Sequence, residues 1–298
     1  MTMRADLGAQ GALMAVGLVW SVGVVLWKLI AASGLSPLGL TVWQTLFAVG
    51  FLWALVRLRG RRLHWDREHL TYYAGLGLLG SLVPTTCYYI AMRGLDAGVA
   101  AIVISCVPML ALLAATLLRI DRPSLIRILG VVLGFAAMAL IAAPGSLPDA
   151  GALPYLGFAL IAALCYGLEG AWIVLRSPDG LDPVSALLGA SVVTLALGLP
   201  LALATGHLFP PALIWNGTGL VMLAATAANI AAYLGYIWIV DRAGPVFAAQ
   251  VSYIITLGGV FWSVTLLDES YTGQVWLSLV LMLAGLALVQ PRRGKLAA

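Results

Sequence analysis

Short charged segments divide the sequence into ten long apolar stretches. Each stretch is close to the roughly 20 residues that an α-helix needs to cross the hydrocarbon of a bilayer. The stretches lie at 11–31, 38–56, 70–92, 97–118, 125–143, 153–175, 184–204, 217–240, 245–267 and 273–290. This spacing predicts an all-α integral membrane protein with ten transmembrane helices.

The composition excludes a water-soluble domain of this length. Of the 298 residues, 62% are hydrophobic and only 9% are charged, whereas about a quarter of the residues in soluble domains are charged. The net charge of +4 comes from basic residues grouped in the connecting segments, which indicates membrane orientation and argues against nucleic-acid binding. The three cysteines are widely spaced within apolar stretches, so they predict neither a disulfide framework nor a metal site. We expect no metal and no cofactor.

The basic residues predict the orientation of the chain. If the N-terminus is inside, fourteen of the sixteen Lys and Arg residues fall in cytoplasmic segments, where such residues are enriched in membrane proteins. They are Arg4, Arg57, Arg59, Arg61, Arg62, Arg67, Arg119, Arg122, Arg127, Arg176, Arg242, Arg292, Arg293 and Lys295. Arg93 falls in an outer loop, and Lys28 can extend from the first helix to the lipid headgroups. We expect a multi-pass cell-membrane protein, of the bacterial inner membrane, with both termini cytoplasmic.

The two halves of the chain, 1–147 and 148–298, share a pattern of motifs. The segment YYIAM…AGVAA, from residue 88, aligns with YIWIV…PVFAA, from residue 236, at an offset of 148 that pairs Asp121 with Glu269. Five helices in each half require that the second half is inverted in the membrane. Inverted repeats are an architecture of secondary transporters, with the substrate site between the halves near mid-membrane. We predict two inverted five-helix repeats that form one structural domain around a central cavity; a structural protein born of gene duplication is the alternative.

Several motifs cover nearly the whole chain. They are LVWSVG and WQTLFA in the first two helices, YYIAMRGLDAGVAAIVISCVPMLALLAATLLRIDRPS in the third and fourth, and LGYIWIVDRAGPVFAAQVSYIITLGGVFWSVTLLDES as the second copy. This set resembles the drug/metabolite transporter superfamily in its ten-helix EamA branch. The resemblance implies a secondary transporter. Within the branch the chain is most similar in type to the YddG-type aromatic amino-acid exporters of bacteria, which implies export of amino acids from the cytoplasm.

The chain departs from the pattern of this family at three positions. Gln44 stands where an arginine is common, Asp121 where a glutamate is usual, and Thr256 where a proline is usual in the ninth helix. Because the arginine is missing from the membrane, the departures argue against a strongly anionic substrate.

Polar and aromatic residues inside the predicted helices mark a candidate cavity, because lipid cannot satisfy a polar side chain. In the eighth helix Thr226, Asn229, Tyr233 and Tyr236 share one face. Amides and hydroxyls suit a zwitterion, and an aromatic face attracts an ammonium by about 0.5–2 kcal/mol; the alternative is that these groups hold helices together at ~0.6 kcal/mol each. The candidate substrate-binding residues are Trp20, Gln44, Tyr88, Glu169, Trp172, Asn229, Tyr233, Gln250 and Tyr253. Aromatics near the span ends are interpreted as an interfacial belt: Trp27, Trp53, Trp65, Tyr72, Tyr73, Trp215, Tyr271 and Trp276.

Glu169 is the only charged residue between Leu156 and Leu175. It lies seven residues before Arg176, so about 10 Å from the predicted cytoplasmic end of its helix. An ionised, unpaired carboxylate there would cost at least ~2.5–3.5 kcal/mol. Protonation, pairing with a cation such as Arg176, or contact with a substrate ammonium would each remove this cost. The sequence leaves the three open, and with them proton-coupled transport and facilitated export.

The prolines Pro84 and Pro108 interrupt predicted helices and are hinge candidates, with a static kink as the alternative. Gly130 and Gly134 form a GxxxG pattern, which indicates close helix packing.

An enzyme is not expected, because the three histidines lie in predicted loops and no aspartate lies deep in a span. An exporter of other metabolites or drugs, and a pore-forming channel, remain as alternative functions. We expect a small-molecule substrate and the lipid bilayer as partners and leave the oligomeric state open.

Overall fold

The chain forms a bundle of helices, with no strand within residues 7–147, 150–213 and 217–289, which the computed structural model describes. The helices of the first half are α1 (Leu7–Ala31), α2 (Pro37–Leu58), α3 (Arg67–Gly77), the π-turn η1 (Leu78–Leu82), α4 (Val83–Gly94), α5 (Ala97–Ile104), α6 (Val107–Leu117) and α7 (Leu125–Ala142). Those of the second half are η2 (Ala150–Ala152), α8 (Leu153–Arg176), α9 (Pro183–Ala204), η3 (Pro211–Leu213), α10 (Thr218–Ala243), α11 (Pro245–Ala248), α12 (Val251–Leu267) and α13 (Gly273–Val289).

Eight helical segments are long and apolar enough to cross a membrane, if α3 to α4 and α5 to α6 are each taken as one segment. Two shorter apolar helices, α12 and α13, complete the set. These ten segments lie where the sequence predicts spans, except that the ninth starts late because α11 and α12 are separated at Ala249 and Gln250. Several residues used above lie outside the described ranges: Arg4, Trp215, Arg292, Arg293 and Lys295.

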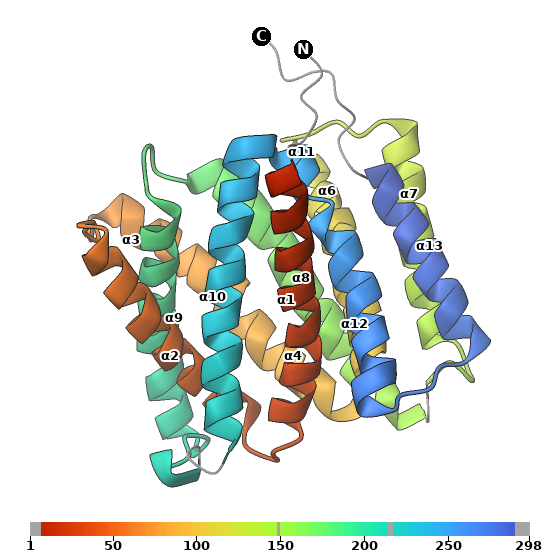
Figure 1. Ribbon diagram of the computed structural model, residues 1–298, viewed down its shortest axis with the longest axis horizontal. Helices are drawn as coiled ribbons and strands as arrows, with labels where there is room; N and C mark the ends of the chain where they lie inside the picture. Colours follow the sequence, from red (N-terminus) through yellow and green to blue (C-terminus); the bar gives the residue numbers. More distant parts are fainter. Residues whose placement is uncertain (1–6, 148–149, 214–216, 290–298) are drawn as a thin grey trace.

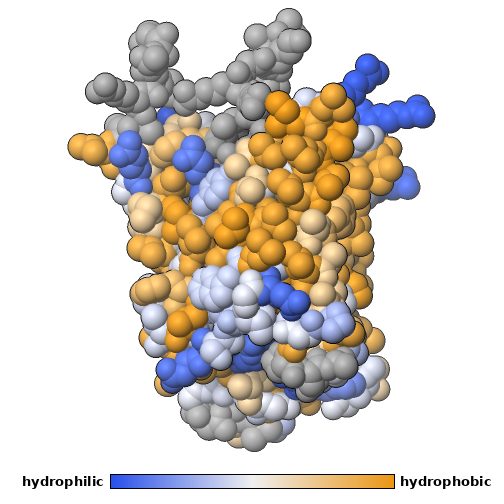
Figure 2. All heavy atoms as spheres, turned by 90° about the vertical axis from the view of Figure 1, so that its right-hand side faces the viewer, coloured by the Kyte–Doolittle hydropathy of each residue, from blue (hydrophilic) through white to orange (hydrophobic). Residues whose placement is uncertain are grey.

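A broad hydrophobic band covers the side of the bundle formed by α7 and α13. Figure 2 shows this band between hydrophilic residues at the top and bottom of the same face. Val132 and Phe135 of α7 and Leu277 and Val280 of α13 are all exposed there. An apolar surface of this extent is typical of a protein that is embedded in lipid.

The two halves of the chain are interleaved. Helix α1 packs on α10 and α12, and the corresponding helix of the second half, α8, packs on α4 and α6. In the same way, the packing of α3 on α9 corresponds to the packing of α10 on α2 when the halves are exchanged. Helix α7 packs on α13, and α5 packs on α12. In Figure 1, α1 and α8 cross the middle of the bundle in opposite directions. The helix contacts are therefore nearly unchanged when the two halves are exchanged.

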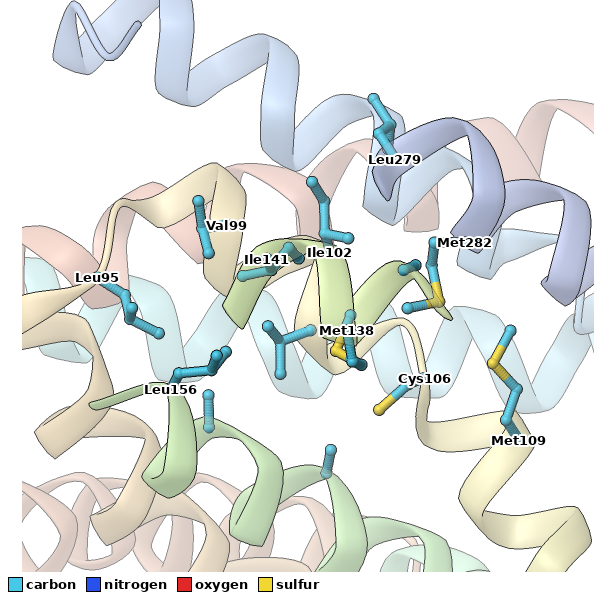
Figure 3. Packing of buried hydrophobic residues seen from close by; sticks show 14 of the residues in the cluster. Leu95, Val99, Ile102, Cys106, Met109, Met138, Ile141, Leu156, Leu279 and Met282 are labelled. Carbon is cyan, nitrogen blue, oxygen red and sulfur yellow. The ribbon is translucent and has the colours of Figure 1, made fainter. Parts of the chain in front are cut away.

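We call the end of the bundle where α1 begins and α13 ends the terminal face, and the other end the opposite face (Figure 1). The main core lies between α5, α6, α7, α8 and α13. Figure 3 shows Ile102, Met138 and Met282 converging in it from three of these helices. This core holds α8 in place, and α8 carries the partly buried carboxylate of Glu169.

Both hinge-candidate prolines lie at real interruptions of the helices. Pro84 follows the π-turn η1, and Pro108 follows the break between α5 and α6. Pro200, by contrast, lies inside the continuous helix α9. A proline has no N–H for the preceding turn, which accounts for the positions of the two breaks.

Glycines allow α7 and α13 to cross closely, as the GxxxG pattern predicts. A β-carbon built on Gly130 would lie 2.7 Å from the carbonyl oxygen of Gly285, and one built on Gly285 would lie 2.7 Å from that of Gly130. A β-carbon on Gly134 would lie 1.9 Å from the sulfur of Met109. The predicted close packing is confirmed.

Lys28, which we expected to extend to the headgroups, binds main-chain carbonyls at the end of the bundle. Its Nζ donates hydrogen bonds to the carbonyl oxygens of Met92, at 2.9 Å, and Leu95, at 2.5 Å. These carbonyls lie at the end of α4 and just after it, where main-chain acceptors lack helical donors. Lys28 therefore joins α1 to α4 at the opposite face.

Candidate functional site

The carboxylate of Glu169 lies against the π-turn η1. A β-carbon built on Gly80, inside this turn, would lie 2.1 Å from Oε1 of Glu169. Only a glycine at position 80 allows so close an approach. The turn itself is wider than an α-helix, since the N–H of Val83 bonds to the carbonyl of Leu78, five residues before it. π-Turns of this kind are frequent at functional sites.

Pro84 leaves main-chain oxygen atoms available beside this carboxylate. Because Pro84 has no N–H, it cannot donate to the carbonyl of Gly80, four residues before it, or to that of Leu79, five residues before it. Within the part of the chain that the structure describes, Glu169 has neither a hydrogen bond nor an ion pair. The carboxylate of Glu169 therefore lies against this turn without a cation from the described residues.

Three tyrosines from three different helices interact electrostatically with Glu169. Tyr166 precedes it by one turn of α8, Tyr72 comes from α3 and Tyr233 from α10. Aromatic faces beside a carboxylate form a favourable environment for an ammonium group.

Trp172 is a packing residue. A β-carbon on Gly75 of α3 would lie 2.1 Å from its ring, and its Nε1 donates to the carbonyl oxygen of Tyr72 at 3.3 Å. The guanidinium of Arg176 lies over the same ring, 5.7 Å from its centroid. Arg176 therefore stacks on Trp172. It does not pair with Glu169, which was one of the three possibilities that the sequence left open.

A second polar group joins α1 to α10 near the tyrosines. Nε1 of Trp20 donates to Oδ1 of Asn229 at 2.9 Å, and the ring of Trp20 lies 5.7 Å from that of Tyr236. The predicted polar face of α10 thus contains Asn229, Tyr233 and Tyr236. Thr226 does not take part, since its hydroxyl donates to the carbonyl of Met222 in its own helix.

Gln44 and Tyr88 lie in a third group, in which α1, α2 and α4 meet. Oε1 of Gln44 accepts a hydrogen bond from the hydroxyl of Tyr89 at 2.5 Å. Trp27 stacks on Tyr89, with 5.1 Å between the ring centroids, and meets Tyr88 edge-on at 5.2 Å. Trp27, which we interpreted as part of an interfacial belt, therefore packs against two buried tyrosines.

The structure does not bring Gln250 and Tyr253 to this site. Gln250 is exposed beside the break between α11 and α12, and Tyr253 packs against the core shown in Figure 3. On the neighbouring turn, the hydroxyls of Ser105 and Thr256 are 2.5 Å apart and link the α5–α6 break to α12. This region holds the two halves together.

Two hollows open at the terminal face. One, of about 600 Å³, lies between the start of α3 and the end of α8. Its lining is Arg67, Glu68, Thr71, Tyr72, Leu175, Arg176 and Ser177. The other, of about 330 Å³, lies between α6, α8, α12 and α13, and is mostly apolar with Asp121 and Arg127 in its lining. Tyr72 lines the larger hollow and also interacts electrostatically with Glu169, so it links the hollow to the surroundings of the carboxylate.

Sequence reasoning missed Tyr72, Tyr166 and Gly80. Tyr166 lies three residues before Glu169, the spacing of one helical face, so its position was available from the sequence. Gly80 precedes Pro84 by four residues, a spacing that marks the carbonyl freed by a proline. Tyr72 lies near a span end and was interpreted as part of the belt, but it is buried.

Comparison with known proteins gives one family and several solved structures with a similar fold. A crystal structure with 19% sequence identity matches 92% of this chain and 96% of its own chain, with a TM-score of 0.59. At that identity it shows a shared fold. No curated protein matches the chain. The model of the EamA-like transporter family matches twice, over residues 8–143 and 153–290, which shows the two-repeat organisation. The chain is therefore a member of the EamA-like transporter family, within the drug/metabolite transporter superfamily.

Proposed function

We propose that this membrane transporter exports amino acids, aromatic or large apolar ones, from the cytoplasm by alternating access. The family makes the protein a transporter of small molecules and a non-enzyme. The proposal adds the substrate, the direction and the mechanism. It further takes the ten apolar segments as ten spans in two inverted repeats.

The carboxylate of Glu169 is the observation that carries this proposal. It has no cationic partner in the described residues, it lies beside Tyr72, Tyr166 and Tyr233, and it contacts a turn with freed carbonyls. A substrate ammonium would bind the oxygen atoms and face the aromatic rings. Asn229 and Tyr236 lie on the same face of α10 as Tyr233, and with Trp20 of α1, which contacts both, they supply surface for an apolar or aromatic substrate side chain.

The distribution of charge supports a cytoplasmic terminal face. Arg57, Arg59, Arg67, Arg122 and Arg176 all lie at the helix ends or loops of that face. Basic residues are enriched on the cytoplasmic side of membrane proteins. The larger hollow would then open to the cytoplasm, from which an exporter takes its substrate.

Export of organic amines is the second candidate, and one observation favours it. The described surroundings of Glu169 supply a carboxylate and aromatic rings for an ammonium, whereas Arg176, the nearest arginine along α8, is stacked on Trp172. A substrate carboxylate would have to be bound by neutral donors. The amine and the amino acid share the ammonium, so a competition experiment separates them.

Counterflow in proteoliposomes tests the proposal. Vesicles loaded with unlabelled phenylalanine are offered labelled phenylalanine, with phenethylamine or 3-phenylpropionate as competitor. We expect wild type to accumulate label, phenethylamine to compete and phenylpropionate to fail. Glu169→Gln should lose most of the exchange, and Asp179→Asn, at an exposed loop position, should keep it.

Three outcomes would contradict parts of this proposal. No exchange with any amino acid by folded protein would reject the amino-acid substrate. Uptake of labelled phenethylamine without uptake of phenylalanine would favour the organic amines. Competition by phenylpropionate as strong as by phenethylamine would reject ammonium binding by Glu169.

A further inference from the structure

The opposite face is closed by a carboxylate that crosses between the two halves. Oε1 of Glu269, which follows α12 in the second half, accepts the N–H of Ala97 at 2.8 Å, and its Oε2 accepts the N–H of Gly98 at 3.2 Å. These N–H groups begin α5 of the first half. The first N–H groups of a helix lack helical acceptors and carry partial positive charge, so a carboxylate binds well there.

Tyr271 and Ser263 hold this carboxylate in place. The hydroxyl of Tyr271 donates to Oε2 of Glu269 and accepts from the N–H of Gly98 at 3.1 Å. Oγ of Ser263, in α12, lies 2.7 Å from the same hydroxyl. The group is packed without free space, because a β-carbon on Gly98 would lie 2.2 Å from the hydroxyl of Tyr271.

The corresponding carboxylate on the terminal face makes no such contact in the described residues. The repeat offset of 148 pairs Glu269 with Asp121. Asp121 stays within its own half, where it accepts from Arg127 Nη1 at 2.7 Å and from the N–H of Arg122 at 2.7 Å. The hollow of about 330 Å³ separates Asp121 from Ala249 and Ser252 of the second half. The two halves are thus joined by a carboxylate at the opposite face, whereas a hollow lies between them at the terminal face.

We propose that Glu269, held by Tyr271, is a positioning residue of the transport cycle that latches the opposite face and must release α5 each time that face opens. The proposal rests on alternating access. If the terminal face is cytoplasmic, the structure is the inward-open state, and the latch prevents substrate from passing straight through.

The latch can be broken from either half of the protein. Glu269→Ala removes the acceptor, and Gly98→Ala displaces Tyr271 while the carboxylate stays. Two variants are matched controls. Asp121→Asn changes the paired carboxylate on the other face, and Gly273→Ala adds a methyl group where no atom lies within 4 Å.

Spin-label distances measure the opening without any substrate. In a cysteine-free background, labels at the exposed positions Ser33 and Ser270 report on the opposite face, and labels at Leu118 and Asp179 report on the terminal face. Charge-assisted hydrogen bonds are lost in Glu269→Ala, so we expect the ratio of open to closed molecules at the opposite face to rise roughly tenfold or more. Gly98→Ala should change it in the same direction. The two controls should leave the closed distance dominant.

The results separate the latch from the proposed mechanism. Unchanged opposite-face distances in folded Glu269→Ala and Gly98→Ala would overturn the latch. Opening at the opposite face with closing at the terminal face would support both the latch and alternating access. Opening at the opposite face while the terminal face stays open would support the latch and reject alternating access.

Discussion

At the scale of single residues, Asp96 is a carboxyl whose negative charge is poorly accommodated. It precedes α5 and is half-buried beside Glu269. Burial, and after it the negative charge of Glu269, raise the pKa of Asp96, while Lys28 acts in the other direction. Tyr271, the other titratable group nearby, stays neutral over the same pH range, because burial and its hydrogen bond to Glu269 raise its pKa. Asp96 makes no side-chain hydrogen bond to the start of α5.

We predict that Asp96→Asn stabilises the protein at pH 7 and much less at pH 4. A carboxyl whose pKa is raised by folding contributes its stability below its ordinary pKa of about 3.9, and loses it as the pH rises through the raised value. The measurement is thermal unfolding of the detergent-solubilised protein at both pH values. Asp179→Asn, in an exposed loop, is the control. An Asn variant that is less stable than wild type at pH 7 would contradict the account.

A site residue was predictable from the sequence where its polarity differed from that of its neighbours along the chain. Glu169 is conspicuous because its neighbours along the chain are apolar. Its partners Tyr72 and Tyr233 lie on other helices, and nothing in the local sequence links them to it. The acceptors of Lys28 were hidden for a similar reason: they are main-chain carbonyls at the end of α4 and just after it, which no side-chain pattern reveals.

At the scale of elements, two glycine-to-alanine substitutions should change the stability of the protein in opposite directions. One lies where α7 crosses α13, and the other lies in α2. Gly130→Ala should destabilise the protein, because the new methyl group would lie 2.7 Å from the carbonyl oxygen of Gly285. Gly50→Ala, in α2, has no atom within 4 Å of the added group and should stabilise by about 0.5–1 kcal/mol through helix propensity. Thermal unfolding in one detergent measures both. If Gly130→Ala were as stable as Gly50→Ala, the close crossing would be wrong.

The positions of the helices were predictable from the sequence, because the thickness of the lipid hydrocarbon sets their apolar length. The breaks within the helices were harder to predict. Hydrophobic length located the ten helical segments to within a few residues, apart from the late start of α12. Pro84 marked the position of a break, but its form, a π-turn against Glu169, depends on a contact with α8. Thr256 occupies the position in the second half that corresponds to Pro108. Without a proline there, the sequence did not predict the break between α11 and α12.

At the scale of the whole molecule, we predict that the terminal face lies in the cytoplasm. Single cysteines at Ser33, on the opposite face, and at Arg61, on the terminal face, are both exposed. A membrane-impermeant thiol reagent applied to intact cells should label the cysteine at position 33 and spare that at position 61. Permeabilised cells, in which both are labelled, provide the control. The reverse pattern of labelling would invert the orientation and with it the assignment of the inward-open state.

Under the proposed alternating access, the latched opposite face and the hollowed terminal face belong to a carrier that must change conformation for each substrate, whereas a pore needs no such step. The contacts between the halves repeat when the halves are exchanged, so a second state with the roles of the two faces reversed is available to the same helices. Transport by a carrier of this kind is faster when substrate is present on the other side, because the carrier then binds substrate for its return step.

The most direct test of that claim is efflux of labelled phenylalanine from proteoliposomes, with and without unlabelled phenylalanine outside. We predict efflux that saturates with internal concentration and accelerates when external phenylalanine is present. Efflux that rises linearly with the gradient and ignores external substrate would contradict the account and indicate a pore.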